Sequence, residues 1–168
     1  LRPLAVHCGT PCTHMSKLGK GDIDDMKWEK NLVKFSIAVL SFQEAQKLLG
    51  SNENPVTSAL HSRKEWKEVF GEPKSPKPPW RYVRCDGCQV GVHSPAAEDS
   101  EAPMQKAQDW MANYPLPLMG QRCRNPFAVQ GCSHQHQHVR GTVKTVTGPW
   151  VSVAKASAAY TDVQGELM

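Results

Sequence analysis

Two adjacent rows of apolar residues in the first third of the chain constrain the fold most. The first row contains Leu32, Phe35, Val39, Phe42 and Leu49. The second contains Val33, Ile37, Leu40, Glu44 and Leu48, and is apolar except at Glu44. Steps of three, four and seven residues place the members of each row along one side of an α-helix. Because the rows are adjacent, the helix has a wide apolar face that two other elements must cover. We predict a long helix that begins after Asp22 or Asp24 and ends at Gly50.

A second helix is expected directly after the first. Asn54 is a suitable cap and Pro55 suits the first helical position. Apolar residues then continue up to Gly71, at Val56, Leu60, Trp66, Val69 and Phe70. The two helices are predicted to form an antiparallel helical hairpin over residues 22–71. Prolines and glycines interrupt residues 1–21, so we expect an irregular arm there.

A proline-rich segment, EPKSPKPP, separates the predicted hairpin from the rest of the chain. Residues 72–80 are therefore expected to form an extended connector. The chain beyond it, residues 81–153, is rich in cysteine and basic residues, and residues 154–168 are expected to be a tail.

Within residues 81–153 the pattern changes from helical to mixed. Short strands are expected around the first cysteines, followed by one helix between Ser100 and Tyr114. β-Branched and aromatic residues between Val139 and Val153 favour a terminal hairpin of strands. The predicted fold class is α+β: an N-terminal helical hairpin, then a small Cys-rich, strand-containing module with one more helix, and irregular arms.

The composition predicts a single domain with a modest core. The chain has 168 residues, and 39 % of them are hydrophobic, below the roughly 45–50 % of ordinary domains. Its six cysteines can supplement such a core through disulfides or a metal ion. The longest apolar run, residues 36–42, is far shorter than the roughly 20 residues of a membrane-spanning helix. The chain begins with Leu1 and shows no signal peptide, which suggests a processed form.

The sharpest local motif is the turn Cys85-Asp86-Gly87-Cys88. Two thiolates on one side of a tight turn are suited to tetrahedral Zn²⁺. We predict that zinc is bound by Cys85, Cys88, Cys123 and Cys132, with His93 or His134 as substitute ligands. The second pair is spaced more widely than in a usual zinc ribbon, so three disulfides, for which 15 pairings exist, are the main alternative.

Two further groups of histidine and cysteine occur in the sequence. The N-terminal arm contains His7, Cys8, Cys12 and His14, which suit a soft cation but are also explained by disulfide pairing or by solvent exposure. The alternating residues His134, His136 and His138 are expected to form an exposed polar edge.

Positive charge is concentrated in the C-terminal third. The formal net charge is +4, and no Asp or Glu occurs between Asp109 and Asp162. Basic residues in this stretch are candidates for contact with a polyanion: Arg122, Arg124, Arg140 and Lys144. With aromatic residues nearby, the stretch indicates either RNA or an acidic protein as a neighbour.

No phosphate-binding loop, serine-nucleophile elbow or metalloprotease helix motif occurs in the sequence. We therefore expect a non-catalytic accessory subunit of a large protein or ribonucleoprotein assembly, in a mitochondrion or plastid. Its fold is expected to be stabilised by zinc or by disulfides, and its surface to contact other protein subunits. No small-molecule substrate is evident. Two alternatives stay open: a secreted or virion-associated protein stapled by disulfides, and a small Cys-dependent enzyme with one unusually reactive thiol.

Overall fold

The structure is a computed structural model that describes residues 3–10, 23–90, 92–93, 103–104, 106–116, 123, 142–144 and 150–152. The chain divides into two compact units. The first unit comprises Leu1–Val83 and Gln108–Pro117, and the second comprises Arg84–Ala107 and Leu118–Met168.

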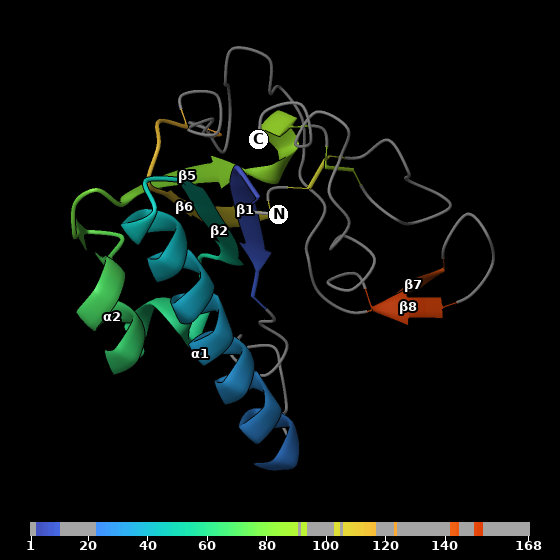
Figure 1. Cartoon of the computed structure of the whole chain (residues 1–168). Coiled ribbons are helices and arrows are strands. Elements are labelled where there is room, and N and C mark those ends of the chain that lie inside the picture. The colour runs from blue at the N-terminus through green and yellow to red at the C-terminus, as the bar shows by residue number, and fades with distance from the viewer. Residues whose placement is uncertain are drawn as a thin grey trace. The chain divides into compact units, whose positions relative to one another are not determined.

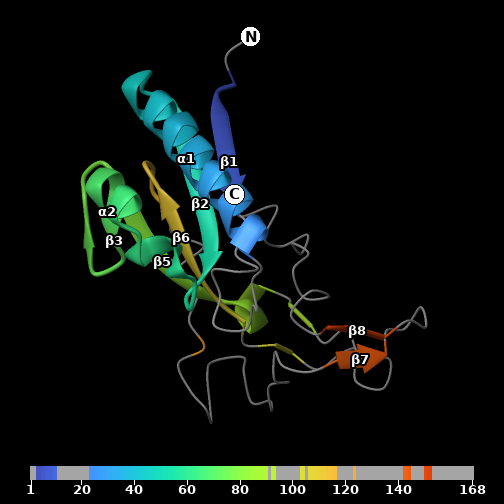
Figure 2. The same cartoon turned by 90° about the horizontal axis from the view of Figure 1, so that it is seen from below.

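The first unit begins with a strand, a helix and a second strand that form one β-α-β motif. Strand β1 (Ala5–Gly9) pairs in parallel with β2 (Leu49–Pro55), so that Ala5 lies opposite Leu49 and Gly9 lies opposite Glu53. Parallel strands must be joined by a crossover segment. Helix α1 (Ile23–Ala45) provides it and packs on both strands, as Figures 1 and 2 show.

The sheet is mixed and has the strand order β1-β2-β6-β5. Strand β6 (Ala107–Ala112) runs antiparallel to β2, and β5 (Arg81–Asp86) forms the edge opposite β1. The short helices η1 (Ala59–Ser62) and α2 (Lys64–Phe70) follow β2. The remaining elements are the paired strands β3 (Gly71–Glu72) and β4 (Ser75–Pro76), the turn η2 (Gly87–Val90), and the antiparallel pair β7 (Thr142–Lys144) and β8 (Trp150–Ser152).

An aromatic core joins the helices to one face of the sheet. Its fully buried members come from α1, η1, α2, the segment before β5, and β6: Val33, Leu40, Leu60, Trp66, Phe70, Trp80 and Met111. The Phe70 ring lies 4.6 Å from that of Trp66 and 4.8 Å from that of Trp80, measured between centroids. Both indole N–H groups are satisfied, since Trp66 donates to the Tyr82 hydroxyl and Trp80 to the Glu44 carboxylate.

The predicted long helix is present, but the predicted helical hairpin is wrong. The first helix follows a strand, β1, within the segment expected to be an irregular arm, and β2 occupies the residues where the second helix was expected to start. The helix ends at Ala45, before Gly50, and Lys47 in the turn that follows adopts the left-handed conformation with φ 55°. Gly50 instead lies in β2, and the only helix in residues 54–71 longer than one turn is the seven-residue α2.

In the structure, the fully buried apolar side chains of α1 come from the second of the two predicted rows. Val33 and Leu40 of the second row are fully buried, whereas Phe35 and Phe42 of the first row are 63 % and 50 % exposed. Periodicity identifies apolar faces, but it does not specify which one a sheet will cover.

The predicted helix between Ser100 and Tyr114 is also wrong, because β6 occupies its centre. Trp110, Met111 and Ala112 are all fully buried. A short apolar run that is buried on both faces fits a strand or a helix equally well, so the sequence pattern was ambiguous here. The pairing of β7 with β8 agrees with the predicted terminal hairpin.

Among the helices that the structure describes, none combines the length and the apolar character needed to cross a membrane.

Candidate functional site at the carboxyl ends of β1 and β2

The carboxyl ends of β1 and β2 meet at one edge of the sheet. In open α/β sheets, ligands bind just outside the carboxyl ends of the parallel strands. The pairing of Gly9 with Glu53 brings the residues that follow β1 next to the Glu53-Asn54-Pro55 end of β2. This edge is therefore the first place to look for functional groups.

Hydrogen bonds hold the chain tightly where it leaves β1. The Asn52 side chain donates to the Cys8 carbonyl at 2.6 Å and to the Thr10 hydroxyl at 2.7 Å. The Asn54 amide donates to the Thr10 carbonyl at 2.9 Å, and the Thr10 hydroxyl donates to Ser36 of α1 at 3.1 Å. Thr10, Ser36, Asn52 and Asn54 are all buried, so Thr10 is fixed from both β2 and α1.

Glu53 provides a carboxylate at the same edge. It lies opposite Gly9, and Gln108 of β6 donates a hydrogen bond of 2.7 Å to its Oε1. Its side chain alternates with those of Asn52 and Asn54 along β2, so it projects from the other face of the sheet. Gln108 thus orients a half-buried acid beside the exit of β1.

Two buried acceptors near this edge have no hydrogen-bond partner. They are the Oδ1 atoms of Asn52 and Asn54, which lie in fully buried side chains. A buried acceptor without a donor costs about 1–3 kcal/mol. Both oxygens are thus suited to accept hydrogen bonds from a donor on a ligand.

The N-terminal group of histidine and cysteine does not act as a unit within β1. His7 and Cys8 are neighbours in a strand, so their side chains lie on opposite faces of the sheet. His7 stacks on Trp110 and lies 2.9 Å from the Ser51 hydroxyl, and burial lowers its pKa. Cys8 packs against the core, and burial raises the pKa of its thiol, although a hydrogen bond with Ser36 opposes that shift. Cys12 and His14 lie outside the described residues.

In the second unit, Cys123 comes close to the predicted zinc turn. Its backbone N–H donates to Asp86 Oδ2 at 2.7 Å, and Cys85, Asp86 and Cys123 are all buried. Cys88 lies in η2, where its sulfur accepts a hydrogen bond from Gln89. Cys8 carries a free thiol. Within the described ranges, no three side chains of His, Cys, Asp or Glu are grouped closely enough to hold a metal ion.

Most of the other predicted site residues cannot be placed. Cys132, His134, Arg122, Arg124 and Arg140 lie outside the described residues, together with His136 and His138. Lys144 belongs to β7, and His93 is exposed and forms a single bridge with Pro103.

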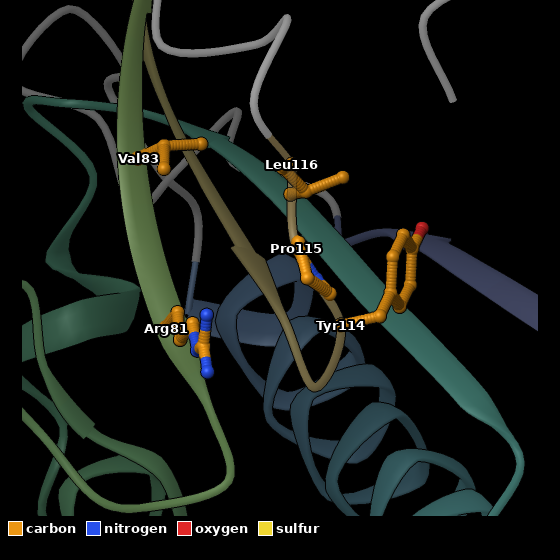
Figure 3. Close-up of a pocket in the computed structure, with 5 residues that line it drawn as sticks. All are labelled: Arg81, Val83, Tyr114, Pro115 and Leu116. Atoms are coloured by element: carbon orange, nitrogen blue, oxygen red, sulfur yellow. The ribbon is translucent and has the colours of Figure 1, made fainter.

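A small pocket of about 270 Å³ lies elsewhere in the first unit. Figure 3 shows the residues that line it: Arg81 and Val83 belong to β5, and Tyr114, Pro115 and Leu116 follow β6. Its lining is mainly apolar and contains neither a thiol nor a carboxylate.

Sequence reasoning missed Thr10, Glu53 and the two asparagines of β2. The only local signal was a polar run, Ser51 to Asn54, directly before a proline, which resembles a helix cap. No protein-family model, curated protein or solved structure that was compared with this chain matches it.

Proposed function

We propose that this chain is a Cys-dependent enzyme whose reaction takes place at the carboxyl ends of β1 and β2. The observation that carries the proposal is the parallel register, which pairs Glu53 with Gly9 at the end of β1. Cys12 follows Thr10 by two residues, a span of at most about 7.6 Å for any chain. We propose that the Cys12 thiol and the Glu53 carboxylate meet at this edge, since such a pair suits covalent catalysis with acid-base assistance.

Each residue of this edge has a distinct role in the proposal. Cys12 is the nucleophile, and Glu53 transfers a proton or binds a donor group of the substrate. Asn52, Asn54 and Thr10 are positioning residues, because they hold the segment that leads to Cys12. The other thiols of the described residues are less suited to attack, since Cys85 and Cys123 are buried and burial raises the pKa of Cys8.

The reactivity of Cys12 toward iodoacetamide tests the proposal. Peptide mapping by mass spectrometry gives the alkylation rate of each cysteine at pH 7, in the folded chain and in urea. We expect Cys12 to be alkylated faster than Cys8, Cys85 and Cys123 in the folded chain, because Cys85 and Cys123 are buried and burial raises the pKa of Cys8. The Cys8 rate should be lower in the folded chain than in urea. A folded-state rate for Cys12 at or below that of these three cysteines would contradict the proposal.

The pH profile of the same reaction tests the role of Glu53. A nearby negative charge disfavours a thiolate, so Glu53→Gln should move the midpoint of Cys12 alkylation to lower pH. Glu68→Gln, an exposed position on α2, removes the same charge elsewhere and should leave the midpoint in place. An unchanged midpoint in Glu53→Gln would show that this carboxylate does not face Cys12.

A second candidate function is that of a non-catalytic accessory subunit whose fold is stabilised by a structural zinc site. It is supported by the hydrogen bond between Cys123 and Asp86, which joins Cys123 to the turn that carries Cys85 and Cys88. These three thiols, with Cys132, would complete the four sulfur ligands of a structural zinc site. In this candidate function, the basic C-terminal third contacts other protein subunits or RNA. The assembly is proposed to be organellar.

Native mass spectrometry tests the zinc site. We expect one zinc per chain, lost in Cys123→Ser and retained in Cys8→Ser, because Cys8, in β1, is not one of the four proposed ligands. A chain that takes up no zinc from solution would contradict this candidate. A mass deficit of six hydrogens would instead indicate that the six cysteines form three disulfides.

A further inference from the structure

A groove lies between the edge of β1 and one side of α1. Its volume is about 470 Å³, and the residues of α1 that line it recur at helical spacing: Trp28, Leu32, Phe35, Ser36 and Val39. All residues from Val6 to Thr10 line the other side. Residues that point to both faces of β1 line the groove, so the groove follows the edge of the strand and not one face of the sheet. Figures 1 and 2 show β1 as the outermost strand, with α1 beside it.

Large apolar side chains are exposed along this side of α1. Trp28 is 61 % exposed, Phe35 is 63 % exposed and Phe42 is 50 % exposed. They follow one another at intervals of seven residues and so form a single row along the helix. An exposed strand edge beside an exposed aromatic row is a surface that proteins usually cover.

We propose that a second copy of this chain covers this surface in a two-fold symmetric dimer. The row is symmetric about Phe35, so an antiparallel pair of α1 helices places Phe35 opposite Phe35. Trp28 of each copy then faces Phe42 of the other. The same two-fold axis sets the β1 edges antiparallel, which closes both open edges at once.

The dimensions of the elements agree with this arrangement. Helix α1 packs over β1 and β2, and neighbouring strands lie about 4.8 Å apart. Joining the two β1 edges therefore separates the two α1 axes by two strand spacings, about 10 Å. Helices in direct contact lie 8–10 Å apart. The two α1 helices are therefore close enough to contact each other through the aromatic row.

The exposed area indicates a dimer of moderate affinity. A fully covered aromatic side chain buries about 150–250 Å², so the exposed parts of the three aromatic residues offer roughly 350 Å² per copy. A stable interface buries about 800 Å² per partner. The aliphatic groove and the β1 edge must supply the rest, and we therefore expect a micromolar dissociation constant.

Sedimentation velocity of the full chain, from about 1 to about 200 µM, measures this association. We expect a reversible monomer–dimer equilibrium. Phe35→Glu places two like charges face to face on the axis and should raise the dissociation constant about tenfold or more. Ala59→Glu adds the same charge at an exposed position of η1 and should leave the constant unchanged. Circular dichroism checks that both variants are folded.

A charge-swap experiment tests the register directly. Phe35→Lys alone should weaken the dimer to a similar extent, whereas an equimolar mixture of Phe35→Lys and Phe35→Glu should associate more tightly than either variant alone, because opposite charges then meet on the axis. A wild-type chain that stays monomeric at the highest concentration overturns the proposal. So does a dimer that Phe35→Glu leaves intact, or a mixture that fails to associate.

Discussion

Replacing Trp80 with alanine is expected to lower the free energy of unfolding by about 4 kcal/mol, the range seen when a large core aromatic is removed. Trp80 is 2 % exposed and packs edge-on against Phe70. Its indole N–H also donates a 2.6 Å hydrogen bond to Glu44 of α1. The substitution therefore leaves a cavity between α1 and the sheet and removes the donor of a partly buried carboxylate.

Trp28→Ala is the matched control, because it makes the same chemical change at a side chain that is 61 % exposed. Its cost should stay below about 1 kcal/mol. Urea titration followed by far-UV circular dichroism measures both variants, with equal slopes indicating that only stability has changed. The measurement should be made at low protein concentration, where the proposed dimer is dissociated. Similar losses for the two variants would show that Trp80 does not anchor the core.

Gly71→Ala should be the next most damaging change, with a loss of about 3 kcal/mol. Gly71 ends α2 and begins β3 with φ 75° and ψ −159°, a conformation available essentially only to glycine. A methyl group there would overlap the Ser75 carbonyl oxygen and lie 2.6 Å from the Lys77 nitrogen. These are backbone atoms of the β3-β4 turn, so they cannot move aside without breaking the turn.

Gly50→Ala provides the comparison for this prediction. A methyl group at Gly50 would lie 3.1 Å from Leu40 and 3.2 Å from Trp80, and both contacts are with side-chain atoms that can shift. Its cost should be about 1–2 kcal/mol. Thermal unfolding of both variants gives the ranking. A larger loss for Gly50→Ala than for Gly71→Ala would contradict the backbone argument.

These stability variants also help to separate folding from chemistry. Trp80 and Gly71 lie outside the edge formed by Gly9, Thr10 and Glu53. If the proposed enzyme is correct, Trp80→Phe should keep the folded-state reactivity of Cys12, because most of the ring remains. Glu53→Gln should change the pH profile of that reactivity without unfolding the chain.

Features with a strong local signal were predictable from the sequence. The 3.6-residue period of the apolar rows identified α1, and the β-branched residues near the C-terminus identified the pairing of β7 with β8. The cysteine motif at residues 85–88 was also visible in the sequence, and zinc binding there stays a prediction. Each of these signals is contained within a few turns or a few residues.

Strand β2 and the site at its end were decided only by the tertiary structure. Asparagine is disfavoured in strands, yet Asn52 and Asn54 are fully buried in β2. They are stable there because Cys8 and Thr10, more than forty residues earlier, accept their hydrogen bonds. The same parallel pairing covers one row of α1, exposes the other, and places Glu53 beside Gly9. Local periodicity contains no information about such pairing, because its free energy comes from contacts between residues distant in sequence.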